Sequence, residues 1–439
     1  MAYTFAMISL GCAKNLVNSE QMLYLMTEAG FELVPEADGA DLAIVNTCGF
    51  IDSAKSEAID AILEMAELKK AGRLGGLIVT GCLSQRYKDT IGEELPEIDA
   101  LLGVGSFADI VAAANSVLEG RGFARFADNS APVDEIPRVI STGPAWAYLR
   151  IAEGCNNFCA FCAIPYIRGR YRSRKMENIL DEAKDLAAHG VKEIIVIAQD
   201  ITRYGTDLYG RRCLAELCRK LSAIEGIEWI RLHYLYPDQF DDELIDEIAG
   251  NEKIVKYLDI PIQHINSAIL KRMNRRGTGE EIRALLGKLR QRIPGLVLRT
   301  SLIAGLPGEG EAEFEELCAF LREARIERVG VFPFCPEEGT PAAEMEHVDA
   351  EEAQRRADLI MSEIQAPIMD EFCQSFVGKK LRVLYEYYDE ESQFHVGRSF
   401  ADSPDIDGLV LFSGSCTEGE MVDVLITGVD DGMLIGEQV

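Results

Sequence analysis

The chain has 439 residues, enough for several domains, and 48% apolar with 27% charged residues is the composition of a folded protein. Its 44 basic and 73 acidic residues give a net charge of −29, so its surface repels phosphate backbones unless one face is locally basic. The sequence shows no signal-peptide pattern and no membrane-length apolar run, and we therefore expect a cytoplasmic protein whose twelve cysteines stay reduced.

Residues 1–140 alternate short apolar runs with helical patterns, which predicts an open parallel α/β sheet. Strands are expected at Tyr3–Leu10, Leu42–Asn46 and Leu77–Thr80. Asn18 and Gln21 form a predicted capping box at the start of the first helix. Each strand is followed by a cysteine, namely Cys12, Cys48 and Cys82. Because ligands bind at the carboxyl edge of such sheets, we expect these three cysteines to lie together.

Residues 141–376 contain six predicted strand–helix repeats, typical of a full or partial TIM-like βα barrel with its chemistry at the carboxyl ends of the strands. The expected strands are Ala147–Ile151, Glu193–Ala198, Trp229–His233, Tyr257–Ile260, Leu296–Ile303 and Val329–Phe334. A predicted linker, Ser130–Gly143 with Pro144, precedes this region. Residues 377–439 contain five short strand patterns, which predict a small antiparallel OB-like barrel.

The strongest motif is Cys155-x3-Cys159-x2-Cys162 in a predicted loop after a barrel strand. A [4Fe–4S] cluster needs thiolates at its iron corners, and three thiolates leave the fourth iron open to bind a substrate. The alternatives are a zinc site completed by a distant histidine, or three unrelated core thiols. The second set, Cys12, Cys48 and Cys82, is interpreted as a second [4Fe–4S] site, and simple packing of small buried thiols is its alternative.

The central motif resembles the radical S-adenosylmethionine (radical SAM) superfamily. This resemblance implies that the open iron chelates SAM and that the reduced cluster cleaves it to methionine and a 5′-deoxyadenosyl radical. In such a pocket, Phe161 is expected to pack on the adenine and Gln199 to make polar contacts. The segment 302–309, LIAGLPGE, resembles a SAM-contacting segment and adds Gly305 and Glu309 to the candidate SAM contacts.

The whole chain resembles the methylthiotransferase family. The matching segments are SLGCAKN at 9–15, NTCGF at 46–50, Gly81-Cys82, and the stretch from Glu153 to Arg174. The family has an α/β domain with a second cluster, a radical SAM barrel and a TRAM barrel in this order. The resemblance therefore implies domains at residues 1–140, 141–376 and 377–439.

Within this family, one branch modifies tRNA adenosine and another methylthiolates an aspartate β-carbon in small-subunit ribosomal protein twelve. Three segments resemble the protein-modifying branch: SLGCAKNLVNSE at 9–20, IPYIRG at 164–169 and GRSFADSPDIDG at 397–408. Ala13 and Asn18 depart from that branch's pattern. Residues 376–439 carry 13 acidic and 4 basic residues, which suits a basic ribosomal protein better than RNA. A solvated acidic surface without a partner is the alternative.

The resemblance implies two [4Fe–4S] clusters, SAM, a reducing electron donor, a sulfide source and a basic ribosomal protein as substrate. The lack of a membrane-length apolar run and the acidic charge predict neither a membrane nor a nucleic acid as direct partner. The rival functions are tRNA adenosine methylthiolation and a non-catalytic iron–sulfur electron carrier, although a carrier normally protects each cluster with four cysteines. The basic run Arg168, Arg170, Arg172, Arg174 and Lys175 follows the central motif. It is a candidate to stabilise cluster charge or to meet an acidic side chain, and a solvated loop is the alternative.

Overall fold

The computed structural model describes residues 2–143 and 145–439, which form two compact units. The first unit comprises Met1–Ser141, Ala152–Arg174 and Cys335–Ala343, and the second comprises Thr142–Ile151, Lys175–Phe334 and Glu344–Val439. Met1 and Pro144, which belong to the predicted first domain and linker, lie outside the described residues. Among the described residues, no helix combines the length and the apolar character needed to cross a membrane.

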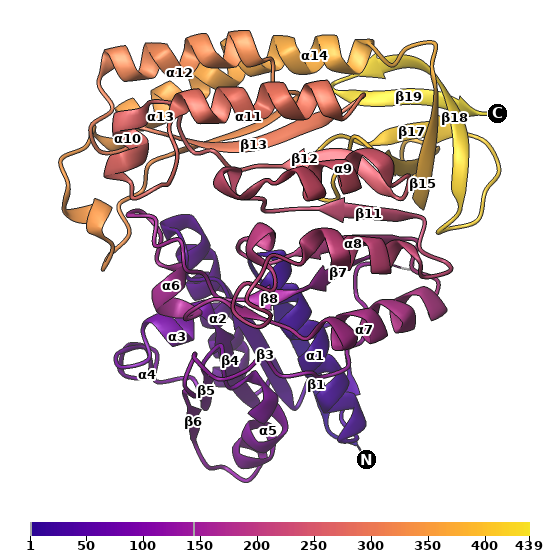
Figure 1. Cartoon of the computed structure of the whole chain (residues 1–439). Helices are drawn as coiled ribbons and strands as arrows, with labels where there is room; N and C mark the ends of the chain where they lie inside the picture. Colours follow the sequence, from indigo (N-terminus) through magenta and orange to yellow (C-terminus); the bar gives the residue numbers. More distant parts are fainter. Residues whose placement is uncertain (1, 144) are drawn as a thin grey trace. The chain divides into compact units, whose positions relative to one another are not determined.

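The first unit is built on a six-stranded parallel sheet with the strand order β2-β1-β3-β4-β5-β6 (Figure 1). Its strands are β1 (Thr4–Ser9), β2 (Glu32–Leu33), β3 (Leu42–Thr47), β4 (Gly76–Gly81), β5 (Ala100–Leu102) and β6 (Phe123–Arg125). Strands β3 and β4 are buried along their whole length, as expected for a parallel sheet covered on both faces.

Helices cover both faces of this sheet. They are α1 (Ala13–Glu28), α2 (Asp52–Lys70), α3 (Cys82–Arg86), α4 (Ile91–Glu94), η1 (Phe107–Asp109) and α5 (Ile110–Leu118). One apolar cluster joins Met22 of α1 and Ala113 of α5 to the sheet, and a second cluster joins Ile62 of α2 to it. The unit also contains β8 (Ala152–Glu153), α6 (Ile164–Ile167) and β9 (Arg172–Ser173).

The second unit contains a second six-stranded parallel sheet, ordered β14-β13-β12-β11-β10-β7. Its strands are β7 (Trp146–Arg150), β10 (Glu193–Ile197), β11 (Trp229–Leu232), β12 (Ile254–Asp259), β13 (Val297–Ala304) and β14 (Arg328–Pro333). The main helices beside it are α7 (Met176–Ala188), α8 (Leu214–Ser222), α9 (Asp242–Gly250), α10 (Ser267–Arg272), α11 (Gly279–Arg292) and α12 (Glu311–Ala324). Short 3-10 turns occur at η2 (Ile201–Arg203), η3 (Pro237–Gln239) and η4 (Pro341–Glu344). The six predicted strands are therefore found, in the predicted order, as a partial barrel.

A helical stretch leads to the small barrel at the end of the chain. It consists of α13 (Ala350–Leu359), the π-helical segment η5 (Ile360–Gln365) and α14 (Ala366–Gln374). The closed barrel, ordered β15-β16-β17-β19-β18, is formed by β15 (Lys380–Asp389), β16 (Phe394–Ser399), β17 (Val410–Ser413), β18 (Met421–Asp430) and β19 (Met433–Gln438). Its pairs are antiparallel except β17 with β19, which is parallel.

Buried charges join the small barrel to the larger one within the second unit. The Glu193 carboxylate of β10 accepts from Arg231 of β11 at 2.7 Å and pairs with Arg398 of β16 at 2.8 Å, with all three side chains excluded from solvent. Arg328 of β14 pairs with Asp402, just after β16, at 2.6 Å. Charges that are buried away from solvent need such partners, and these ion pairs link the two barrels of this unit.

Candidate functional site: two cysteine sets in one unit

The first cysteine set lies at one edge of the first sheet. Cys12 follows β1 and is the N-cap residue of α1, Cys48 follows β3, and Cys82 follows β4 as the first residue of α3. Strands β1, β3 and β4 are neighbours in that sheet. The structure thus places all three cysteines at the carboxyl ends of adjacent strands, the edge where ligands of α/β sheets bind.

Glycines let these strand ends approach closely. Gly81 has φ +102°, and a Cβ there would lie 2.4 Å from the carbonyl oxygen of Thr47. A Cβ on Gly11 would lie 2.8 Å from the Cβ of Cys48. Only glycine fits such positions without displacing backbone or a cysteine.

Asn15 is the polar centre of this edge. Its buried Nδ2 donates to the carbonyl oxygens of Leu10 (3.1 Å) and Thr47 (2.8 Å), which belong to the segments that carry Cys12 and Cys48. Its Oδ1 accepts from the Cys82 thiol at 3.7 Å. One side chain in the first turn of α1 therefore ties together the segments carrying all three cysteines.

The start of α1 differs from the prediction. The helix begins at Ala13, directly after Cys12, so the predicted capping box of Asn18 and Gln21 is wrong, because both residues lie inside the helix. Gln21 instead donates to the carbonyl oxygen of Ile136 at 3.1 Å. The earlier start is what brings Asn15 and Cys12 together.

The three thiols differ in acidity. Burial raises the pKa of Cys82 to about 11, and the neighbouring Cys12 and Cys48 add to the rise. Burial also raises the pKa of Cys48. The pKa of Cys12 is lowered, because Lys14, Arg168 and the nearby backbone N–H groups outweigh the desolvation of a thiol that still reaches solvent. The positive charge of Arg168 favours the thiolate at all three positions, and thiolates are the form that binds metal.

The second cysteine set lies in the same unit. Cys155, Cys159 and Cys162 occupy the loop between β8 and α6; the first two are buried and Cys162 is half-buried. Phe158, between the first two, has φ +48°, a conformation that non-glycine residues rarely adopt and that marks a constrained loop. Phe161 is half-buried in this loop.

Arg168 joins the two sets. Its Nη1 donates to Glu153 at 2.9 Å, two residues before Cys155, and its Nη2 donates to Asn15. Of the other basic-run residues, Arg174 pairs with Glu135 at 2.5 Å and Arg170 is exposed, lying over the Phe158 ring at 4.5 Å. The basic run thus has different environments, and Arg168 is the member whose charge acts on the cysteines of the first set.

The other candidate SAM contacts lie in the second unit. Gln199 follows β10, and its buried Oε1 has no hydrogen-bond partner within residues 2–143 and 145–439. Gly305 follows β13 with φ +82°, and its N–H donates to Glu309 at 2.8 Å. The Glu309 carboxylate also accepts from Arg356 at 2.8 Å and contacts His264 at 3.1 Å. Its oxygens therefore brace the Gly305 turn.

Sequence reasoning missed Glu337. This residue is 2% exposed and accepts from Lys55 of α2 at 3.1 Å and from Arg86 of α3 at 2.7 Å, so it ties down the helices that follow Cys48 and Cys82. Its partners lie 282 and 251 residues away in sequence, which leaves no local pattern to find. Asn15 and Glu153, in contrast, stand inside the quoted motifs.

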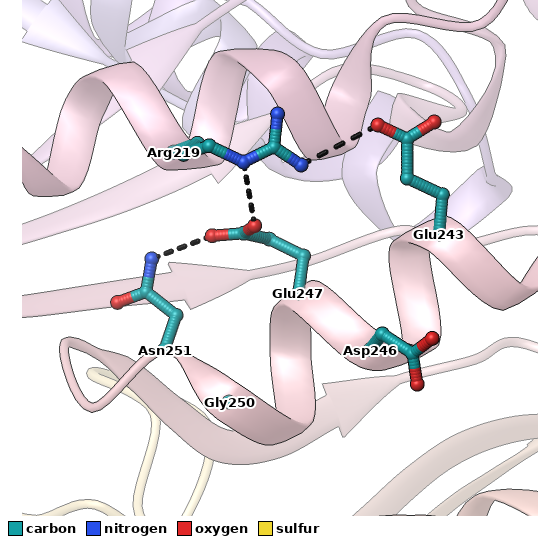
Figure 2. Close-up of a pocket in the computed structure, with 6 residues that line it drawn as sticks. All are labelled: Arg219, Glu243, Asp246, Glu247, Gly250 and Asn251. Atoms are coloured by element: carbon teal, nitrogen blue, oxygen red, sulfur yellow. Dashed lines mark hydrogen bonds and ion pairs between the residues drawn. The ribbon is translucent and has the colours of Figure 1, made fainter.

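The second unit also has a surface hollow of about 510 Å³ on α8 and α9 (Figure 2). Arg219, which lines it, donates to Glu247 at 3.0 Å and to Glu243 at 3.4 Å. The hollow is lined by Arg219, Glu243, Asp246, Glu247, Gly250 and Asn251, and so holds none of the candidate site residues. We interpret it as a solvated, internally paired groove.

Comparison with known proteins agrees with this architecture. Residues 149–321 match the radical SAM superfamily, residues 4–103 match the uncharacterized protein family UPF0004, and residues 377–439 match the TRAM domain. The radical SAM methyltransferase TsrM from Kitasatospora setae has a similar fold, with a TM-score of 0.57 and 15% identity over 78% of this chain and 77% of TsrM. The cobalamin-dependent enzyme OxsB has a TM-score of 0.54 at 14% identity, over 84% of this chain and 56% of OxsB. Fold and domain matches together define a radical SAM enzyme.

The full-length relatives narrow this class. The chain is 48% identical to a protein of Acetivibrio thermocellus over 98% of this chain and 97% of the relative, and 49% identical to a protein of Lachnoclostridium phytofermentans over 98% of each. Both relatives are ribosomal protein uS12 methylthiotransferases RimO. The chain belongs to the RimO family.

Proposed function

We propose that this chain attaches a methylthio group to the β-carbon of an aspartate in ribosomal protein uS12. Membership of the RimO family supports this substrate. The structural observation that carries the proposal is the presence of two three-cysteine sets in one compact unit, with Arg168 contacting Glu153 beside one set and Asn15 beside the other. Electron transfer alone would not require two incompletely ligated sites.

Each cysteine set would hold one [4Fe–4S] cluster. The residues fit such a cluster, because each set offers three thiols, one set from a single loop and the other from a single sheet edge. Glycines at the first set let neighbouring backbone segments approach each other closely. When bound, the clusters and SAM supply the electron, the radical, the sulfur and the methyl group. Cys155, Cys159 and Cys162 would hold the SAM-binding cluster, while Cys12, Cys48 and Cys82 would hold the sulfur-carrying one.

The remaining candidates serve SAM or its surroundings. Phe161 is proposed to pack on the adenine, and the unpartnered Gln199 Oε1 to accept a hydrogen bond from SAM. Gly305 would allow close backbone approach, with Glu309 holding its turn through the 2.8 Å bond to the Gly305 N–H. Phe161 and Gln199 would bind and orient SAM, Glu309 would keep the Gly305 turn in place, and no proton transfer is assigned to any of these residues.

The acidic small barrel supports a basic protein substrate. Residues 376–439 carry 13 acidic and 4 basic residues. At one exposed hairpin end of this barrel, the acidic residues Glu390 and Glu391 face solvent together with Tyr387 and Tyr388. This acidic surface attracts a basic protein and repels the negatively charged backbone of RNA. An electron donor and a sulfide source complete the proposed partners.

Mass spectrometry of uS12 from cells with and without this gene tests the function. The expected result is a mass gain of one methylthio group on a single aspartate, present only with the gene. Unmodified uS12 in both strains, together with a gene-dependent methylthio group on tRNA adenosine, would assign the chain to the rival reaction.

A further inference from the structure

We propose that Arg168 is a positioning residue that holds a permanent positive charge against the cluster bound by Cys12, Cys48 and Cys82, and so raises the reduction potential of that cluster. The inference rests on the proposed function, because it needs a cluster at this set. Arg168 lies in the basic loop that follows the radical motif, between α6 and β9.

The contacts of Arg168 leave part of its charge unsatisfied. The side chain is 1% exposed, and its only ion pair among the described residues is with Glu153, at 2.9 Å. Its other acceptor is the neutral amide of Asn15. Its Nε is buried and finds no hydrogen-bond partner among residues 2–143 and 145–439. A guanidinium presents five N–H donors in a fixed fork, so a buried donor without an acceptor points to a missing anionic group.

The first cysteine set is the place for that group. Asn15 Oδ1, which accepts from Arg168 Nη2, also accepts from the Cys82 thiol at 3.7 Å, so the guanidinium and this thiol share one oxygen atom. Cys82 also packs in one buried cluster with Ile167, the residue before Arg168. The guanidinium therefore lies beside Cys82 and the cluster that its set would bind.

The same side chain connects the two cysteine motifs. Asn15 braces the segments of the first set, and Glu153 stands two residues before Cys155 and accepts from the Gly154 N–H at 3.2 Å. Arg168 bridges these two residues. Net charge and hydrogen bonds to the sulfurs set the potential of an iron–sulfur cluster. Because reduction adds negative charge, a fixed cation beside the cluster favours the reduced state.

Three full-length variants separate charge from structure. Arg168→Gln removes the charge and keeps one donor group, whereas Arg168→Lys keeps the charge and loses the two-armed bridge. Arg174→Gln is the matched control, a buried arginine of the same basic run whose guanidinium pairs with Glu135. Each reconstituted protein is assayed for iron and sulfide, and its clusters are titrated by redox-controlled electron paramagnetic resonance. Addition of SAM identifies the SAM-binding cluster by the change in its signal.

We expect Arg168→Gln to lower the midpoint potential of the cluster at Cys12, Cys48 and Cys82. The oxidised form should be favoured about tenfold at a fixed potential, which corresponds to a shift of about 59 mV for a one-electron couple. Arg168→Lys and Arg174→Gln should stay near the parent value. Loss of the cluster in Arg168→Gln but not in Arg168→Lys would also support the proposal, because only the positive charge is common to Arg and Lys. The proposal is overturned if Arg168→Gln keeps both cluster and potential, or if the Gln and Lys variants show equal shifts or both lose the cluster.

A Cys155→Ala, Cys159→Ala, Cys162→Ala chain distinguishes this inference from the function on which it rests. If this chain binds no iron after reconstitution, the second cluster of the proposed function is wrong. If it binds a cluster whose potential ignores Arg168→Gln, the inference about Arg168 alone fails.

Discussion

At the scale of single residues, Asn15 and Arg168 show what lies around the cysteines. Sequence motifs identified the six candidate thiols, because their spacing and their positions after strands are local properties. Asn15 stood in a quoted segment without a role, and Arg168 was one of five basic residues that were candidates to stabilise cluster charge. Only the fold singles these two out, because it brings Asn15 to Thr47 and Arg168 to Glu153. The same reason hid Glu337, whose partners come from α2 and α3.

Cysteine substitutions test the division of labour between the two sets. Cys159→Ala should abolish reductive SAM cleavage, because a cluster needs its thiolate corners. Cys48→Ala should leave SAM cleavage intact and abolish methylthio transfer to uS12. Chromatography of 5′-deoxyadenosine, run beside mass spectrometry of the substrate, gives both readouts. Loss of SAM cleavage in a correctly folded Cys48→Ala protein would contradict the division.

Glu193 is expected to dominate the stability of the second unit. Glu193→Gln leaves Arg231 and Arg398 buried with a neutral partner, which should cost about 3–5 kcal/mol of unfolding free energy. Asp423→Asn is the control, because its pair with Lys380 is largely exposed and is worth about 0–1 kcal/mol. Denaturant titration of both variants measures the difference, and equal losses would refute the assignment.

The pKa of Glu193 also sets the direction in which the stability of the fold changes with pH. Burial raises the pKa of Glu193, but Arg231 and Arg398 outweigh it, so the folded-state pKa lies below the ordinary value of 4.5. The stabilisation is therefore complete above about pH 4.5 and is lost as the pH falls through the folded-state pKa. Stability measured against pH should fall less steeply in this acid range for Glu193→Gln than for the parent chain.

At the scale of elements, long apolar strands could be predicted from the sequence, whereas very short strands and the first residue of helix α1 could not. The six strands of the larger barrel follow the predicted order because each is a recognisable apolar run. Strands β7, β10 and β11 are buried along their whole length, whereas β13 alternates between buried and half-buried residues. Strands β2, β5 and β6 were missed, because two or three residues show no periodicity. The beginning of α1 was missed because Cys12, an unusual N-cap residue, makes no side-chain capping bond.

The end of β4 provides a test at this scale. Gly81→Ala should lower the iron bound by the first cysteine set, because its methyl group would overlap the Thr47 backbone and push the segments of Cys48 and Cys82 apart. Gly190→Ala is the control: its φ of +97° is similar, but nothing lies within 4 Å of the added carbon. Iron analysis of the two reconstituted proteins decides, and equal iron content would contradict the expected role of the close approach.

At the scale of the whole molecule, composition and pattern order predicted the fold class, and the closed barrel at the end of the chain is confirmed. Within the predicted antiparallel barrel, one pair differs, since β17 and β19 run parallel. Sequence could not predict that the small barrel shares buried ion pairs with the larger sheet, because Glu193 and Arg398 are distant in the chain.

Removal of residues 377–439 should therefore destabilise the larger barrel. Without Arg398 and Asp402, the charges of Glu193 and Arg328 lose partners that burial requires. We expect a lower melting temperature or aggregation of the shortened chain. Tyr387→Ala with Tyr388→Ala serves as the control, since both rings are exposed. A shortened chain that melts like the parent would show that the small barrel is an independent module.

The composition of the first unit has a consequence for how the protein is made. That unit combines Met1–Ser141 and the radical motif with Cys335–Ala343, and buried Glu337 of the last segment secures Lys55 and Arg86. During translation the early segments leave the ribosome long before Glu337 is synthesised. The helices that follow Cys48 and Cys82 therefore gain this brace only after most of the chain has been synthesised.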